Sequence, residues 1–122
     1  EPTIAHQREA VTRAMRLLSS TGAPRMTVTA LSRHLGYSPW HFCRLFRRIS
    51  GRTMTTYRER VRLARALRRL REAPDTDLTF LALELGYCSH SHFTSTFRRT
   101  LGYTPSSFAA ARRRRRRYAI SA

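Results

Sequence analysis

The chain repeats one pattern of residues at positions about fifty residues apart, and this repeat limits what it can fold into. Residues 35–54 are LGYSPWHFCRLFRRISGRTM, and residues 85–105 are LGYCSHSHFTSTFRRTLGYTP. Both segments contain Leu-Gly-Tyr, then Phe-x-x-x-Phe-Arg-Arg, then Gly-x-Thr, whereas most of the residues between these positions differ. Because such a repeat indicates one structural unit used twice, we expect two related units in the chain.

The apolar residues recur at the spacing of helix faces. Residues 3–20 place four of them on one stripe: Ile4, Val11, Met15 and Leu18. A helix that begins at Ser38-Pro39, with Ser as N-cap and Pro in its first turn, carries a second stripe at i, i+3, i+4 and i+7: Phe42, Leu45, Phe46 and Ile49. Phe93 and Phe97 repeat two positions of this second stripe, so the second unit is expected to have the same buried face.

Capping residues mark the other helices. Thr27 and Asp77 are expected N-caps of two short helices, and Pro105 opens the last helix. A long helix is expected over 54–72, and at 1.5 Å per residue it spans roughly 28 Å. A rigid connector of this length could hold two helices near the ~34 Å that separates successive major-groove faces of DNA. No segment alternates as a strand would, so the sequence predicts an all-α fold of seven helices with two helix-turn-helix motifs.

The charge of the chain indicates a polyanionic partner. Its 122 residues include 24 basic and 7 acidic ones, for a net charge of +17, and every basic residue is Arg. In a compact chain these positive charges repel one another. Binding to a polyanion would relieve the repulsion; nucleic acid is the first candidate and an anionic membrane the second. A GC-rich genome is the alternative explanation of the all-Arg usage. No apolar run approaches about 18 residues, so no membrane span is expected.

In a helix-turn-helix the second helix buries one face and offers the other to the major groove. The expected base-reading residues lie on the exposed faces of two recognition helices, at about 39–49 and 90–100: Trp40, His41, Cys43, Arg44, His90, Ser91, His92, Thr94 and Ser95. Arg44 is the best candidate, because Arg bonds bidentately to guanine and contributes about 1–3 kcal/mol of discrimination. The alternatives are a solvated Arg44 and a Trp40 that is partly buried against the first helix or Tyr37.

Hydroxyl groups at helix starts, and arginines further along the recognition helices, are expected to bind DNA phosphates. These residues are Arg47, Arg48, Thr53, Thr55, Thr56, Arg98, Arg99, Thr104, Ser106 and Ser107. Ordinary N-capping and solvation are the alternatives for them. The six arginines at 112–117 are either a helical extension along phosphates or a disordered tail.

Metal binding and catalysis have little support in the sequence. The segment from Cys88 to His92 reads CSHSH, but no second Cys/His pair has the spacing of a metal site. A redox switch between Cys43 and Cys88 would require the two thiols to meet, which no pattern indicates. There is no nucleophile motif and no Gly-rich phosphate loop. The sequence therefore predicts no metal, no cofactor and no enzyme activity.

The repeated segments resemble the AraC/XylS family of bacterial transcription regulators over about 27–108. The motifs are LSRHLGYSPWHFCRLFRRISGRTMTTYRERVRLARALRRL and LALELGYCSHSHFTSTFRRTLGYTPSSF, which include Arg62-Leu63-x-x-Ala66. The resemblance implies a bilobed DNA-binding domain over 1–122 built from homeodomain-like units. Its expected parts are a first helix-turn-helix subdomain, a linker helix, a second such subdomain and a basic tail, at 3–53, 54–72, 73–111 and 112–122.

The resemblance also implies a function and its partners. Family members usually activate transcription, bind adjacent major grooves of double-stranded DNA and act with RNA polymerase, which implies a cytoplasmic, nucleoid-associated protein that does not bind membranes. The chain resembles the stand-alone MarA, SoxS and Rob type, which implies a monomer on DNA, or else the DNA-binding part of a larger regulator that a missing domain could dimerise. A non-specific binder of RNA, architectural DNA or acidic lipid is the alternative.

The resemblance assigns the base-reading positions unequally. In the first recognition helix they map onto Trp40, Cys43 and Arg44, and in the second onto the following residues: His90, Ser91, His92 and Ser95. Ser95 stands where Arg is common in the family, and Gln is common where Cys43 and His90 stand. The second motif is therefore expected to read bases weakly and to contribute mostly backbone affinity.

Overall fold

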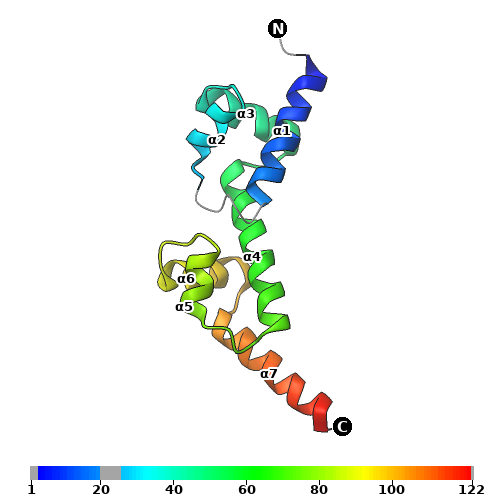
Figure 1. The fold of residues 1–122 in the computed structure, drawn as a ribbon, viewed down its shortest axis with the longest axis vertical. Helices are drawn as coiled ribbons and strands as arrows, with labels where there is room; N and C mark the ends of the chain where they lie inside the picture. The colour runs from blue at the N-terminus through cyan, green and yellow to red at the C-terminus, as the bar shows by residue number, and fades with distance from the viewer. Residues whose placement is uncertain (1–2, 20–25, 122) are drawn as a thin grey trace. The chain divides into compact units, whose positions relative to one another are not determined.

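The computed structural model describes residues 3–19 and 26–121, and these form seven α-helices without a strand, as the sequence predicts. The helices are α1 (Ile4–Ser19), α2 (Val28–His34), α3 (Pro39–Ser50), α4 (Met54–Glu72), α5 (Leu78–Glu84), α6 (His90–Leu101) and α7 (Pro105–Ser121). Two compact units divide the chain at 1–61 and 62–122, and the long helix α4 runs from the first unit into the second (Figure 1).

Side-chain caps fix where the short helices begin. The Thr27 hydroxyl accepts from Ala30 N at 3.0 Å, and the Asp77 carboxylate accepts from Phe80 N at 3.0 Å. Ser38 caps α3 in the same way at 3.2 Å, which confirms the predicted starts of all three helices. These caps satisfy amide groups that have no partner inside the helix, so each helix has one favoured first residue.

The core of the first unit lies where α1 and α2 pack against α3 and the start of α4. Its buried residues are Ala10, Val11, Ala14, Leu18, Leu31, Phe42, Leu45, Phe46 and Met54. Ile4 belongs to the same apolar stripe as Val11 and Leu18 but lies outside this core, because it is 69% exposed. Ile4 lies in the first turn of α1, and burial on this helix begins only at Ala10.

The second unit repeats this arrangement with α5, α6 and α7 around the later part of α4. Its buried core comprises Leu63, Ala66, Leu70, Leu81, Ala82, Leu85, Tyr87, Phe93, Phe97 and Ala109. Phe93 and Phe97 are fully buried, as Phe42 and Phe46 are in the first unit, which confirms the shared buried face. Four aromatic residues thus anchor the two recognition helices, and their remaining faces are left outside.

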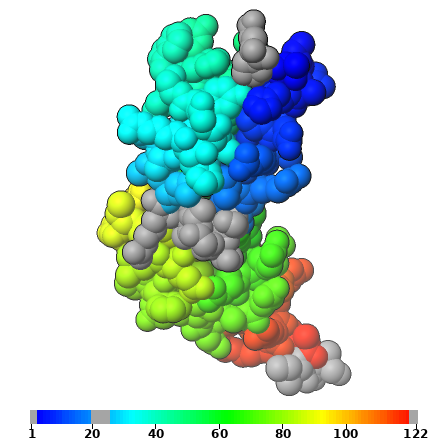
Figure 2. All heavy atoms as spheres, turned by 45° about the horizontal axis from the view of Figure 1, so that its top comes forward, coloured from blue at the N-terminus to red at the C-terminus, as the bar shows by residue number. Residues whose placement is uncertain are grey.

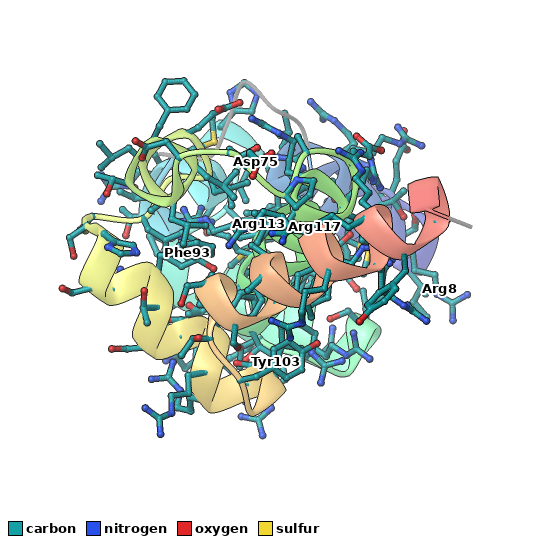
Figure 3. All side chains as sticks on the ribbon, turned by 90° about the horizontal axis from the view of Figure 1, so that it is seen from below. Arg8, Asp75, Phe93, Tyr103, Arg113 and Arg117 are labelled. Carbon is teal, nitrogen blue, oxygen red and sulfur yellow. The ribbon has the colours of Figure 1, made fainter. Side chains whose placement is uncertain are left out.

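Helix α7 continues through the six arginines to Ser121, so the segment 112–117 is helical and the disordered-tail alternative does not hold for it. Figure 2 shows its orange-red atoms against the green atoms of the same unit. Two of these arginines contact the end of α4 or the turn that follows it. Arg113 donates to the Pro74 carbonyl oxygen at 2.9 Å and lies 3.8 Å from the Asp75 carboxylate. Arg113 and Asp75 are labelled in Figure 3. Arg116 donates to the carbonyl oxygen of Glu72, which is the last residue of α4.

Candidate nucleic-acid interface

The outer face of α3 is formed by the residues that its buried aromatic stripe leaves outside. Phe42, Leu45 and Phe46 are at most 1% exposed. The four residues predicted to read bases on this helix are all exposed: Trp40, His41, Cys43 and Arg44. Trp40 is 69% exposed, an unusual state for the largest apolar side chain, so the alternative that it packs into the first unit does not hold.

Arg44 and Trp40 contact each other on this outer face. The guanidinium carbon of Arg44 lies 4.7 Å from the centroid of the Trp40 ring, within the range of a cation–π contact. Tyr37 packs instead on His41, with ring centroids 5.5 Å apart, and on Phe42 at 5.2 Å. The tryptophan therefore lies against the arginine and not in the core, and the pair presents a planar cation beside an apolar ring.

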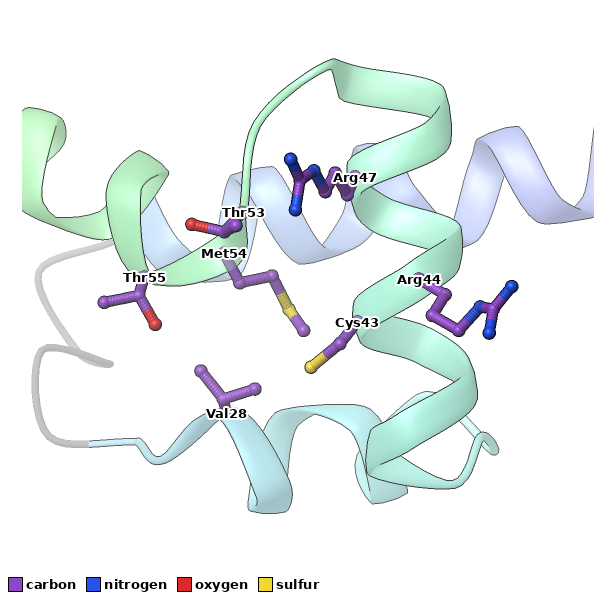
Figure 4. Close-up of a pocket in the computed structure, with 7 residues that line it drawn as sticks. All are labelled: Val28, Cys43, Arg44, Arg47, Thr53, Met54 and Thr55. Atoms are coloured by element: carbon purple, nitrogen blue, oxygen red, sulfur yellow. The ribbon is translucent and has the colours of Figure 1, made fainter.

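A shallow pocket of about 250 Å³ lies between α3, the start of α2 and the start of α4 (Figure 4). Its lining residues are Val28, Cys43, Arg44, Arg47, Thr53, Met54 and Thr55. Cys43, Met54 and Val28 point toward one another across it, whereas Arg44 points away on the other side of α3. A guanidinium and two hydroxyls therefore border an apolar floor, so this pocket offers hydrogen-bond donors to an anionic group.

The hydroxyls at the starts of α4 and α7 are already hydrogen-bonded within the chain. Thr53 accepts from Thr56 N at 3.1 Å, and Thr104 accepts from Ser107 N at 3.1 Å. Thr53 and Thr104 therefore cap their helices, as the capping alternative predicted. Thr104 is half-buried, and the other residues predicted to bind phosphate are exposed: Arg47, Arg48, Thr53, Thr55, Thr56, Arg98, Arg99, Ser106 and Ser107. A cap hydroxyl retains a free lone pair and its helix end retains unpaired amides, so capping and phosphate binding are compatible.

Helix α6 offers a more polar surface than α3. His90, Ser91, His92 and Ser95 are exposed, whereas Thr94 is half-buried. The N-cap serines, Ser38 of α3 and Ser89 of α6, place the two helices in register. In that register Trp40 corresponds to Ser91 and Arg44 to Ser95, so α6 lacks both members of the cation–π pair.

Besides the Arg-Arg pair that the repeat shares, a histidine occupies the same position on the outer faces of both helices. The ring of His92 meets Tyr87 at 5.3 Å and 81°, just as His41 meets Tyr37 at 5.5 Å and 71°. A single residue inserted after Tyr87 shifts the repeat, and correcting for this shift pairs His41 with His92. Each histidine therefore packs against the tyrosine in the turn of its own motif, although both histidines remain exposed.

Several arginines contact other parts of the chain rather than only solvent. A guanidinium nitrogen of Arg58 donates to the Met26 carbonyl oxygen, and Arg62 lies 5.4 Å from the Tyr87 ring centroid. Arg69 forms an ion pair with Glu84 at 2.7 Å. Together with Arg113 and Arg116, these side chains link the ends and sides of α4 to neighbouring segments. No local sequence pattern predicts these contacts, because each joins segments far apart in the chain.

Cys43 and Cys88 are both exposed free thiols. Within residues 3–19 and 26–121, no group of three or more His, Cys, Asp or Glu side chains is arranged to hold a metal ion. No helix in those same residues has both the length and the apolar character needed to cross a membrane.

Comparisons with known proteins agree with this arrangement. A family described as a helix-turn-helix domain matches residues 31–114. The HTH-type transcriptional regulator GlxA of Rhizobium meliloti is 40% identical over 80 residues, which are 65% of this chain and only 24% of GlxA. The regulatory protein SoxS of Escherichia coli K12 is 34% identical over 85 residues, which are 68% of this chain and 77% of SoxS.

A solved structure extends the likeness to the whole fold. The DNA-binding domain of AdpA, a global transcriptional factor determined in complex with a target DNA, matches with a TM-score of 0.74 and 28% sequence identity. The match covers 90% of this chain and 95% of that domain. With two helix-turn-helix units, an exposed outer face on each recognition helix and these relatives, the chain belongs to the AraC/XylS family of bacterial transcription regulators.

Proposed function

We propose that this chain recognises a specific double-stranded DNA site by placing α3 and α6 in adjacent major grooves, and that it activates transcription from there. The observation that carries the proposal is the exposed pair of Arg44 and Trp40, held together on the outer face of α3. Arg can bond bidentately to guanine, and an apolar ring can contact a thymine methyl group, so this pair can distinguish base pairs.

In this proposal the two recognition helices have unequal tasks. Trp40 and Arg44 read bases from α3, with His41 and Cys43 beside them. The exposed residues of α6 contribute weaker base contacts: His90, Ser91, His92 and Ser95. Thr94 is half-buried and contributes least.

Phosphate contacts then supply most of the affinity. The proposed contacts are Arg47, Arg48, Thr53, Thr55, Thr56, Arg98, Arg99, Thr104, Ser106 and Ser107. The net charge of +17 supports this assignment, because each neutralised phosphate releases counterions from the DNA.

The proposal includes the setting in which the protein works. It binds DNA as a monomer in the cytoplasm, at the nucleoid, and contacts RNA polymerase to activate transcription. Because the chain spans only about a quarter of a relative such as GlxA, a further domain that dimerises it would change the stoichiometry and leave the two helix-turn-helix units as the DNA-binding part.

Selection of bound sequences from random double-stranded DNA tests the proposal. We expect an enriched motif with its strongest positions grouped over a single half of the site, where α3 binds. The affinity for the selected site should exceed that for unrelated DNA by about 10³-fold or more at physiological salt. If no motif is enriched and all sequences bind equally, the chain is instead a non-specific polyanion binder.

A further inference from the structure

The second half of α7 carries exposed arginines in addition to those that contact the end of α4. Arg113 and Arg116 donate to backbone carbonyl oxygens there, which fixes one side of α7 against that end. Because a helix has about 3.6 residues per turn, Arg114 and Arg115 lie on other sides of α7, and both are exposed. Arg117 is exposed beside them. We call Arg114, Arg115 and Arg117 the α7 arginine cluster.

The charge of this cluster is not balanced by acidic side chains of its own helix. No acidic residue follows Glu84 in the sequence. Arg114 and Arg117 are three residues apart, and like charges at that spacing on a helix repel each other. A bound polyanion would relieve this repulsion, so the charge of the cluster fits an anionic partner.

The composition of the cluster narrows the kind of partner. A helix that lies on a membrane needs an apolar face, and a protein interface needs apolar residues at its centre, whereas residues 112–117 are all Arg. Tyr118, which is 76% exposed, adds one aromatic ring, but single-stranded nucleic acids are bound on several stacking rings. Guanidinium groups without apolar neighbours suit the phosphates of double-stranded DNA, which require charge and no base contact.

The cluster lies away from the part of the second unit that is proposed to read DNA. The residues proposed to contact bases lie in the first half of α6, between His90 and Ser95. Helix α7 starts after the end of α6 and leads away from it, as Figures 1 and 3 show. Arg114 lies nine residues after Pro105, which is about 14 Å along the helix axis. The cluster is therefore well separated from a phosphate bound at the start of α7.

We propose that the α7 arginine cluster binds the phosphates of a second DNA duplex while α3 and α6 hold the first, so that one chain bridges two DNA segments. The inference rests on the proposed function, because it takes the first duplex to be held by the recognition helices. The cluster contacts phosphates and no bases, so the second duplex can have any sequence. Its binding depends on counterion release and weakens steeply as salt is added.

A capture experiment tests the binding of the second duplex. Beads carry a duplex with the selected site, are saturated with the protein and washed, and then receive a fluorescent duplex of unrelated sequence at low salt. We expect the parent chain to retain the fluorescent duplex. The variant R114Q/R115Q should retain about tenfold less, because two phosphate contacts are lost, while its affinity for the selected site changes by less than about twofold. Its circular dichroism melt should be unchanged.

The variant R13Q/R16Q is the matched control, because Arg13 and Arg16 are exposed on α1 and their replacement removes the same charge. It should capture the second duplex as the parent does. Undiminished capture by R114Q/R115Q would overturn the inference, and so would an equal loss in R13Q/R16Q, which would make capture a matter of net charge alone.

Three further results would also contradict the inference. R114Q/R115Q could lose affinity for the selected site to the same extent, which would place the cluster on the first duplex. The parent chain could capture no second duplex, or it could capture RNA in preference to DNA. The preference for the selected site over unrelated DNA, measured in solution with one duplex at a time, judges the proposed function separately from all of these.

Discussion

The guanidinium of Arg44 lies 4.7 Å from the centroid of the Trp40 ring, one turn earlier on α3. The contact holds two long exposed side chains in one arrangement before any DNA is present. Because a preorganised guanidinium loses less side-chain entropy on binding, the tryptophan should strengthen the base contact of the arginine as well as making contacts of its own.

A double-mutant cycle on DNA binding should detect this cooperation. We expect Trp40→Ala and Arg44→Ala each to weaken binding to the selected site, and the double variant to lose less than the sum of the two. An exposed cation–π contact predicts a coupling of about 0.5–1 kcal/mol in titrations at fixed salt. Additive losses would mean that the two side chains act independently on the DNA.

Salt dependence should be steep if phosphate contacts supply most of the affinity. Neutralising about 6–10 phosphates predicts that the logarithm of the association constant falls with the logarithm of salt concentration with a slope of about −5 to −9. Changing Arg98 to Gln should reduce the magnitude of that slope by about 1 and weaken binding to all sequences alike. A flat salt response in these titrations would rule out this account of the affinity.

Thr96 offers a test of core packing in the second unit. Its side chain is 1% exposed, and its hydroxyl has no hydrogen-bond partner within the described residues. In the register set by Ser38 and Ser89 it corresponds to Leu45, a buried apolar residue. Thr96→Val should therefore raise the free energy of unfolding by about 1 kcal/mol, since it removes an unpaired buried polar group at constant shape.

Urea denaturation followed by circular dichroism measures this change. Thr100→Val is the matched control, because Thr100 is exposed on the same helix and its replacement should change stability by less than about 0.5 kcal/mol. A loss of stability in Thr96→Val, with Thr100→Val unchanged, would show that the Thr96 hydroxyl is paired after all.

The arginines of α7 should divide into two groups. Arg113 and Arg116 donate to carbonyl oxygens at and just beyond the end of α4, whereas Arg114 and Arg115 are exposed. We expect R113Q/R116Q to lower the free energy of unfolding by about 1–2 kcal/mol, because it leaves these carbonyls without charged donors. R114Q/R115Q is the control and should change stability by less than about 0.5 kcal/mol in the same urea experiment.

The same two variants also separate the candidate functions. A non-specific polyanion binder that relies on the Arg run should lose affinity for unrelated DNA and RNA in R114Q/R115Q. A sequence-specific regulator should instead keep its preference for the selected site in that variant. Retained affinity for every polyanion, together with lost site preference, would fit neither function.

Much of the fold could be predicted from the sequence because local signals specify it. Caps such as Thr27, Ser38 and Asp77 mark helix starts, and the spacing of Phe42 and Phe46 marks the buried face. The limits of α4 are those that the sequence predicted, 54–72. These features depend only on residues within one or two turns of each other.

What could not be predicted depends on contacts between distant segments. Six consecutive arginines have no apolar periodicity, so only the position of the α4 end beside α7 explains why Arg113 and Arg116 lie where they do. The contact of Trp40 with Arg44 is a choice among several side-chain rotamers that spacing alone does not settle. The individual roles of the proposed DNA-binding residues stay predictions.

The unequal roles of α3 and α6 are the central claim, and Arg44→Ala compared with Ser95→Ala tests it most directly. These residues share one position in the two recognition helices, so affinity should be measured for each variant on the selected site and on every single-base-pair change of it. We predict that Arg44→Ala loses about 1–3 kcal/mol and relaxes preference at one or two base pairs, while Ser95→Ala changes both by less than about 0.5 kcal/mol. Equal losses on all sequences for Arg44→Ala, or a comparable loss of preference for Ser95→Ala, would contradict the claim.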